Sequence, residues 1–139
     1  MYLLDTDTLT YFQSGVANVV RRVRDVGERL VGTTVMNRIE ILRGRFEFLR
    51  KAADRGELLR AQDLLHQSDR FLSKLTIIPF NEASATEFET LRQRKSLKKI
   101  GRSDLLIACI VLARRDTLVT RNLKHFRLIP NLKIENWID

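Results

Sequence analysis

Short apolar runs alternate with helix-forming segments along the whole chain, and this alternation constrains the fold more than any other feature. The runs with strand character lie at residues 2–5, 29–32, 75–80, 117–120 and 132–137. Segments with helical spacing or helix-cap residues separate them. Strands and helices that alternate in this way are typical of a parallel sheet with helices on both faces. The sequence therefore predicts an α/β fold.

The first helices are expected before residue 27. Thr6, Asp7 or Thr8 can cap a short helix that ends near Gly15. Valines at helical spacing then predict a second helix, with Gly27 as its stop signal. The first of these helices follows directly after the first strand, so Asp5, at the end of that strand, lies where a helix begins.

Two consecutive helices are expected in the middle of the chain. Thr34 is a good N-cap for the first, and Gly56 is expected to close it. Residues 57–72 fit a second helix, so the pair predicts an antiparallel helical-hairpin arm. Further on, Asp104 opens a strongly apolar helix over residues 105–113.

The composition limits the class of protein. The chain has 139 residues, which predicts a single domain over 1–139, and its 44% apolar content is ordinary for a protein with a core. With one cysteine, Cys109, it can form no internal disulfide and no Cys-rich metal site. No apolar stretch is long enough for a membrane span, and the N-terminus lacks the pattern of a signal peptide. We expect a cytoplasmic protein.

The charge balance is basic, with 25 Lys and Arg against 17 Asp and Glu and a formal net charge of +8. A small protein of this charge often binds a polyanion, most commonly nucleic acid. The alternative is a cationic surface that serves solubility alone. Net charge does not decide between the two.

Four polar residues are expected at one edge of the sheet. Asp5 ends the first strand, Glu40 lies about two turns into the helix after the second, Asp104 begins the apolar helix, and Asn122 follows the fourth strand. Open parallel sheets place their sites at the carboxyl ends of the strands. Each residue has an ordinary alternative: a helix cap, a solvated helix position, a favourable first-turn charge or a turn residue. Their convergence predicts a site.

Carboxylates clustered without His or Cys favour a hard divalent cation. Asp5, Glu40 and Asp104 are the expected ligands of Mg²⁺ or Mn²⁺, both of which prefer oxygen donors. Without an ion these carboxylates would repel one another and their pKa values would rise. A bound ion would activate water and stabilise charge on a phosphate, which is the chemistry of phosphodiester hydrolysis.

Basic residues near these positions are expected to contact the nucleic-acid backbone, because such contacts are numerous and carry little sequence information. The predicted RNA-binding residues are Arg38, Arg43, Lys98, Lys99, Arg102, Arg121 and Lys124.

Three blocks of the sequence resemble the PIN-domain toxins of the VapC family. They are LLDTDTLT at residues 3–10, TTVMNRIEILRG at 33–44, and the long block from 100 to 137. The last block is the most specific, since an Asp begins an apolar helix and LVTRN, a His-Phe pair and a final Asn-Trp follow in order. The resemblance extends over the chain from end to end.

The resemblance implies a three-layer α/β/α fold with a mostly parallel sheet of about five strands. It implies a Mg²⁺- or Mn²⁺-dependent endoribonuclease that cleaves tRNA or mRNA, a homodimer, and inhibition by a small antitoxin. By position, the metal-site acids of the family match Asp5, Glu40 and Asp104. Asn122 stands where many PIN domains have a fourth acid, and Asp7 stands where relatives often have Asn. Asp7 either adds a carboxylate near Asp5 or caps the helix, and of the two we expect the cap.

Two other functions fit part of the sequence. Asp5-Thr6-Asp7 has the Asp-x-Asp form of haloacid-dehalogenase-type phosphatases, in which the first Asp is a nucleophile. That interpretation leaves Glu40 and Asp104 without a role, and no acidic pair follows the fourth strand. A non-catalytic RNA-binding or antitoxin-docking module is the other alternative, favoured only by the missing fourth acid at Asn122.

Overall fold

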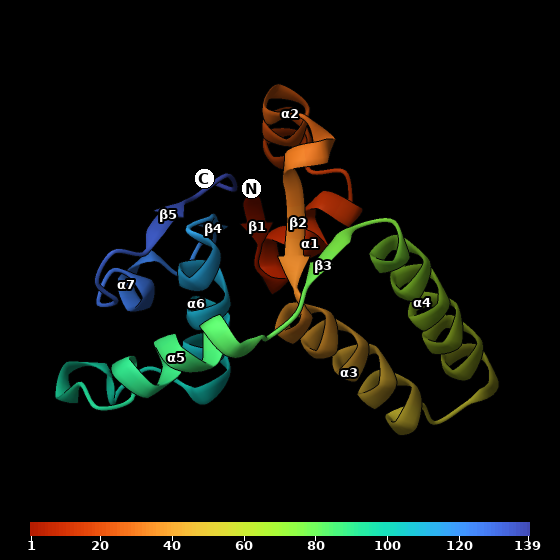
Figure 1. The fold of residues 1–139 in the computed structure, drawn as a ribbon. Coiled ribbons are helices and arrows are strands. Elements are labelled where there is room, and N and C mark those ends of the chain that lie inside the picture. Colours follow the sequence, from red (N-terminus) through yellow and green to blue (C-terminus); the bar gives the residue numbers. More distant parts are fainter.

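A five-stranded, all-parallel sheet forms the centre of the computed structural model, which describes all 139 residues (Figure 1). The strands pair in the order β3-β2-β1-β4-β5. They are β1 (Tyr2–Leu4), β2 (Val31–Thr34), β3 (Thr76–Ile78), β4 (Thr117–Val119) and β5 (Lys133–Glu135). The predicted α/β class is confirmed, and every strand lies within or beside an apolar run of the sequence.

Seven α-helices connect the strands. They are α1 (Thr6–Gln13), α2 (Ala17–Val26), α3 (Val35–Lys51), α4 (Arg55–Ser73), α5 (Glu82–Leu91), α6 (Arg102–Arg114) and α7 (Leu123–Phe126). None of them is both long and apolar enough to cross a membrane.

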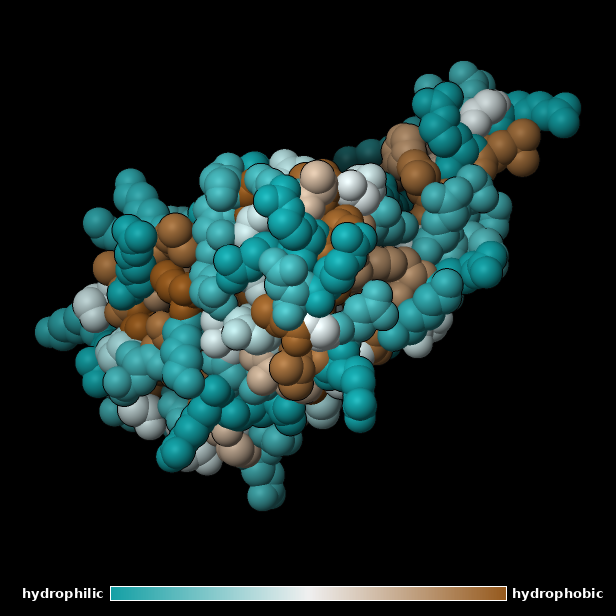
Figure 2. All heavy atoms as spheres, turned by 90° about the horizontal axis from the view of Figure 1, so that it is seen from above, coloured by the Kyte–Doolittle hydropathy of each residue, from teal (hydrophilic) through white to brown (hydrophobic).

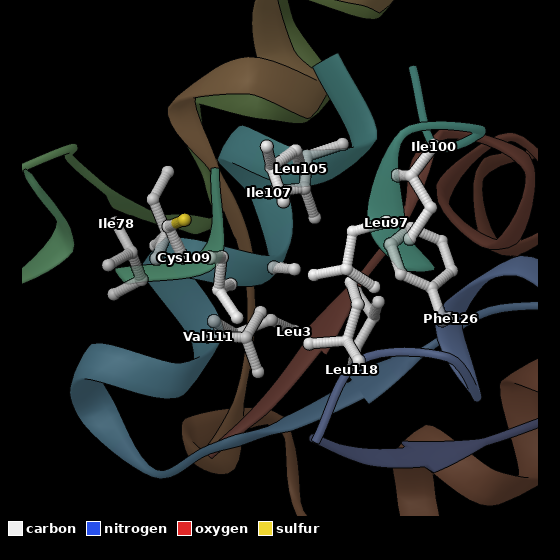
Figure 3. Close-up of a cluster of buried hydrophobic side chains, with 14 residues drawn as sticks. Leu3, Ile78, Leu97, Ile100, Leu105, Ile107, Cys109, Val111, Leu118 and Phe126 are labelled. Atoms are coloured by element: carbon white, nitrogen blue, oxygen red, sulfur yellow. The ribbon is translucent and has the colours of Figure 1, made fainter. Parts of the chain in front are cut away.

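Buried side chains form two cores, one on each face of the sheet. Leu3 and Leu118 point to the face covered by α5 and α6, where Figure 3 shows them beside Ile107 and Phe126. Leu4 and Val119 point to the opposite face, which α1 and α2 cover together with the near part of the α3–α4 pair. Neighbouring residues alternate between faces because side chains alternate along a strand. The result is the expected three-layer α/β/α arrangement.

Helices α3 and α4 form the expected hairpin arm, which projects from the sheet at the lower right of Figure 1. The prediction that Gly56 closes the first helix is wrong. Asp54 accepts a hydrogen bond from the backbone N–H of Glu57 at 2.8 Å, and Glu57 accepts one from the Ala53 N–H at 2.8 Å. These reciprocal bonds start α4 at Arg55, so Gly56 lies in its first turn.

Two other boundaries differ from the sequence prediction. The second strand begins at Val31, because residues 28–30 form a 3₁₀ turn. The cap of α1 is Asp5, whose side chain accepts from the Thr8 N–H at 2.9 Å. Asp7 lies inside the first turn and is exposed, so the expectation that Asp7 caps the helix is wrong.

Candidate functional site

Strand β1 occupies the centre of the sheet, and the later strands add on both sides of it. Strands β2 and β3 follow on one side, while β4 and β5 lie on the other. The carboxyl ends of β1 and β4 are therefore adjacent at the point where the strand order reverses, which is the usual place for a site in an open parallel sheet. A cleft of about 190 Å³ opens there. Its lining residues are Asp5, Thr6, Asp7, Asn37, Glu40, Asp104, Ile107, Asn122 and Phe126.

Asp5 is fixed at the end of β1. Its backbone N–H donates to the Val119 carbonyl at 3.0 Å, which continues the β1–β4 pairing by one residue. Its carboxylate caps α1 through the Thr8 N–H. Asp5 is therefore both the cap of α1 and a residue that lines the cleft.

Glu40 reaches the cleft from the side of α3. Thr6 donates its hydroxyl to Glu40 Oε2 at 2.8 Å, and Ser103 donates to Oε1 at 2.5 Å. Behind Thr6, the buried Asn37 side chain donates its amide to the Thr6 hydroxyl at 3.2 Å. Thr34, the N-cap of α3, donates its hydroxyl to the side-chain oxygen Oδ1 of Asn37 at 2.6 Å. The Glu40 carboxylate is thus held by hydroxyl groups from two other helices.

Asp104 and Asn122 complete the cleft from the side of β4. Asp104 is in the first turn of α6 and is partly buried. Asn122 precedes α7, and its backbone N–H donates to the Thr120 hydroxyl at 3.0 Å. The side-chain amide of Asn122 lies 3.2 Å from Nδ1 of His125. All four predicted site residues therefore line one cleft.

The carboxylates in the cleft have no basic partner. None of Asp5, Glu40 or Asp104 forms an ion pair. Burial raises the pKa of Asp5 above its ordinary value, although hydrogen bonds from Thr120 and Thr8 offset part of the effect. Burial also raises the pKa of Asp104, and the charges of Glu40 and Asp5 add to the rise while His125 opposes it. The carboxylates repel one another, as the sequence predicted for a site without a cation.

The cleft offers the type of ligand atom, oxygen, that a partly hydrated divalent cation prefers. Four carboxylates and two side-chain amides line the cleft, and hard cations prefer such oxygen ligands. No three His, Cys, Asp or Glu side chains are close enough together to bind one ion directly. Mg²⁺ usually keeps several waters and takes one or two carboxylates, so the open arrangement suits such an ion.

Six of the seven predicted RNA-binding residues form no ion pair in the structure and are exposed at the surface. Arg102 stacks on the Phe88 ring, with its guanidinium carbon 4.7 Å from the ring centroid. The seventh, Arg121, is engaged within the chain: it donates to the Tyr11 hydroxyl at 3.2 Å and to Asp139 at 3.3 Å.

Sequence reasoning missed several polar groups of the cleft. Thr6 and Ser103 each stand next to a predicted acid in the sequence, and His125 belongs to the His-Phe pair. For these three residues, the only available signal was position close to a predicted site residue. Asn37 lies three residues after the helix cap Thr34, but its burial, with 1% exposed, could not be predicted from the sequence. Asp7 lines the cleft as well, as a fourth carboxylate at its exposed margin.

Solved structures of known proteins share this fold over the whole chain. No family model matches the sequence. The toxin–antitoxin complex VapBC2 of Rickettsia felis, bound to a promoter DNA fragment, contains a chain that is 29% identical, with 98% of both chains covered and a TM-score of 0.78. VapBC-1 of nontypeable Haemophilus influenzae gives 22% identity, 99% and 98% coverage and a TM-score of 0.79, a likeness of fold alone.

Curated sequences agree with the structural likeness. Ribonuclease VapC1 of Haemophilus influenzae is 26% identical, with 99% of this chain and 98% of the relative covered. The chain is thus similar to VapC proteins over its whole length. Ribonuclease VapC2 of Rickettsia felis is more similar, at 46% identity, but over 50% of this chain and 53% of the relative. The matched segment thus spans about half the length of that VapC protein.

Proposed function

We propose that this chain is a VapC-type, divalent-metal-dependent endoribonuclease, and that it is the toxin of a toxin–antitoxin pair. One observation carries the proposal: Asp5, Glu40, Asp104 and Asn122 line a single cleft at the switch point of the sheet, and none of the three acids has a basic partner. The names of the VapC relatives support the activity. In this proposal residues 1–139 form one PIN domain.

The residues of the cleft have distinct roles in phosphodiester hydrolysis. Asp5 and Asp104 would hold Mg²⁺ or Mn²⁺, while Glu40 would either complete the shell of the ion through a water or orient the attacking water. The amide of Asn122 donates to a phosphate oxygen. A divalent cation, when bound, lowers the pKa of water and offsets charge on the phosphate. Attack by water leaves 3′-hydroxyl and 5′-phosphate ends.

Unpaired basic side chains supply the contacts to RNA. Lys98, Lys99 and Arg102 are exposed in and just after the segment that leads into α6. Lys124 is exposed on α7, two residues after Asn122. Each phosphate contact of this kind is weak and sensitive to salt. Arg38 and Arg43, exposed on the helix that carries Glu40, add further positive charge.

The arm supports the proposal of a protein partner. Phe46 is 53% exposed on α3, and Leu59 is 59% exposed on α4. Figure 2 shows apolar atoms in brown, interrupted by hydrophilic ones, at the end that projects to the right, on the side where Figure 1 places the arm. Exposed apolar groups of this size often mark interaction sites. The antitoxins in the VapBC complexes make a small antitoxin the natural candidate. The implied homodimer stays a prediction.

Cleavage of bulk tRNA in the presence of Mn²⁺ tests the function. The parent protein is expected to fragment the RNA, while Asp5→Asn, prepared in the same way, is expected to be inactive. Equal RNA loss with both proteins would indicate a contaminating nuclease and would refute the proposal. A 2′,3′-cyclic phosphate on the products would refute the role of water, because the ribose hydroxyl would then be the nucleophile.

The two alternatives make different predictions in the same assay. A non-catalytic RNA-binding or antitoxin-docking module would retain RNA without cleaving it. A phosphatase of the haloacid-dehalogenase type would form an aspartyl phosphate, an acyl phosphate, on Asp5 as the phosphate ester bond of the substrate breaks and its alcohol leaves. In the structure, the side chain of Asp5 accepts a hydrogen bond from the Thr8 N–H and caps α1. The phosphatase mechanism also gives no role to Glu40 and Asp104, which line the same cleft.

A further inference from the structure

The Glu40 carboxylate accepts a hydroxyl hydrogen bond on each of its oxygens, and each hydroxyl comes from a different helix. Thr6 is the first residue of α1, and Ser103 is the second residue of α6. Their bonds to Oε2 and Oε1 measure 2.8 and 2.5 Å. Two short bonds from opposite sides fix both the position of the carboxylate and the rotation of its plane.

The two hydroxyl groups are supported differently. Thr6 also accepts the amide of Asn37, so its hydroxyl hydrogen is directed at Glu40 by a group behind it. Asn37 is in turn bonded to Thr34 and is almost fully buried. The only hydrogen bond of the Ser103 side chain is the one to Glu40. Removal of the Ser103 hydroxyl therefore disturbs Glu40 and leaves the buried polar chain behind Thr6 intact.

We propose that Thr6 and Ser103 are positioning residues that hold the Glu40 carboxylate in its working orientation. The inference rests on the proposed function, because it assigns the orientation of one of its acids. Each carboxylate oxygen keeps a free lone pair after accepting one hydroxyl, so Glu40 can still bind a water or an ion. Without the two hydroxyl groups, the flexible Glu side chain would sample several rotamers and the correct geometry would be populated less often.

Ser103→Ala and Ser103→Thr form the first test. With RNA and Mn²⁺ saturating, Ser103→Ala should lower kcat about tenfold, as is typical for loss of an orienting partner, with KM nearly unchanged. Ser103→Thr keeps the hydroxyl and should restore most of kcat. Ser73→Ala is the matched control, because its hydroxyl donates to a backbone carbonyl on the exposed end of α4. A kcat unchanged in Ser103→Ala, or not restored in Ser103→Thr, would overturn the proposal.

Binding of Mn²⁺ alone, followed by electron paramagnetic resonance, gives a readout that needs no cleavage. Ser103→Ala should weaken Mn²⁺ binding about tenfold in the parent protein. In a Glu40→Gln background the same change should have no further effect, because Ser103 acts through Glu40. An equal loss in both backgrounds, or none in the parent, would contradict the inference. A parent that binds Mn²⁺ but cleaves no RNA would refute the proposed function, while the comparison of the two backgrounds would still decide the role of Ser103.

Discussion

Acids at the two ends of the parallel strands differ in whether a basic group compensates their charge. The amino edge of the sheet is where the strands begin, and the carboxyl edge is where they end. At the amino edge, Asp116 stands just before β4, and its side chain is 8% exposed. It accepts from the N-terminal ammonium of Met1 and from Arg114, both at 2.7 Å. At the carboxyl edge, Asp5 and Asp104 face Glu40 without any basic partner.

This difference separates structural charge from functional charge. A buried acid that serves stability is paired within the chain, because an uncompensated charge in the interior is costly. The acids of the cleft forgo that compensation even though the chain carries an excess of Lys and Arg. Sites that must bind a cation or move a proton keep perturbed acids of this kind. The contrast can be tested at each edge by changing one acid at a time.

The largest expected effect comes from Asp104→Asn. The change keeps the shape of the side chain but removes one of the charges that would hold the cation. We expect the rate of RNA cleavage to fall about a thousandfold or more, on the order of 4 kcal/mol of transition-state stabilisation. The measurement is kcat/KM on bulk tRNA with Mn²⁺, with the circular dichroism spectrum as a check that the fold is kept. Activity within tenfold of the parent would contradict the assignment of Asp104.

The next effect concerns stability alone. Asp116→Ala leaves the Met1 ammonium and Arg114 without their shared acceptor, so we expect the free energy of unfolding to fall by about 3 kcal/mol. Urea denaturation measures the loss. The activity per folded molecule should stay near that of the parent, because Asp116 lies at the edge opposite the cleft. A large fall in activity without a fall in stability would mean that the two edges do not divide their roles in this way.

Addition of Mn²⁺ should stabilise the protein through the carboxyl edge. An ion at a hundred times its Kd contributes about 2.7 kcal/mol, which differential scanning fluorimetry detects as a rise in Tm that EDTA reverses. The raised pKa values of Asp5 and Asp104 mean that protons compete with the ion. The stabilisation by Mn²⁺ should therefore shrink as the pH falls through those raised values. A shift in Tm of the same size in Asp5→Asn would place the ion elsewhere.

The smallest effect is expected without any metal. Folding raises the pKa of Asp104, so the folded state binds its proton more tightly than the unfolded state does. The free energy of unfolding should then fall as the pH rises from the ordinary carboxyl pKa through the raised value. At pH 7 and in EDTA, Asp104→Asn should consequently melt slightly above the parent. Asp25→Asn on α2, outside the cleft, is the control. A lower Tm for Asp104→Asn would mean that the carboxylate contributes favourable contacts.

The sequence was sufficient for the parts of the site that follow directly from strands. Asp5 and Asn122 come just after apolar runs, so parallel pairing alone brings them to one edge. Glu40 was harder to place, because it depends on the rotation of α3 about its axis, with Ile39 exposed and Ile41 buried on either side. The hydroxyl bonds from Thr6 and Ser103 could not be predicted, since they join helices that are distant in sequence.

Errors arose where two local signals compete. Glycine often ends a helix, so Gly56 was predicted to do so. The cap formed by Asp54 and Glu57 instead starts a new helix at Arg55, one residue before Gly56. In the sequence, an apolar stripe at helical spacing runs along α3 and consists of Val35, Ile39, Leu42, Phe46 and Leu49. It predicts burial for Phe46, which is 53% exposed because only α4 covers that part of the arm. Local periodicity identifies an apolar face but not the element that covers it.

The pairing of β1 with β4 also sets the order of events during synthesis. Leu3 pairs with Leu118, so the two central strands are far apart in the sequence. Asp5 leaves the ribosome well before Asp104 and Asn122 do. A growing chain cannot assemble the cleft until β4 has emerged and closed this long-range contact. The acids of the cleft therefore remain apart on a nascent chain for as long as residues 117–122 are still untranslated.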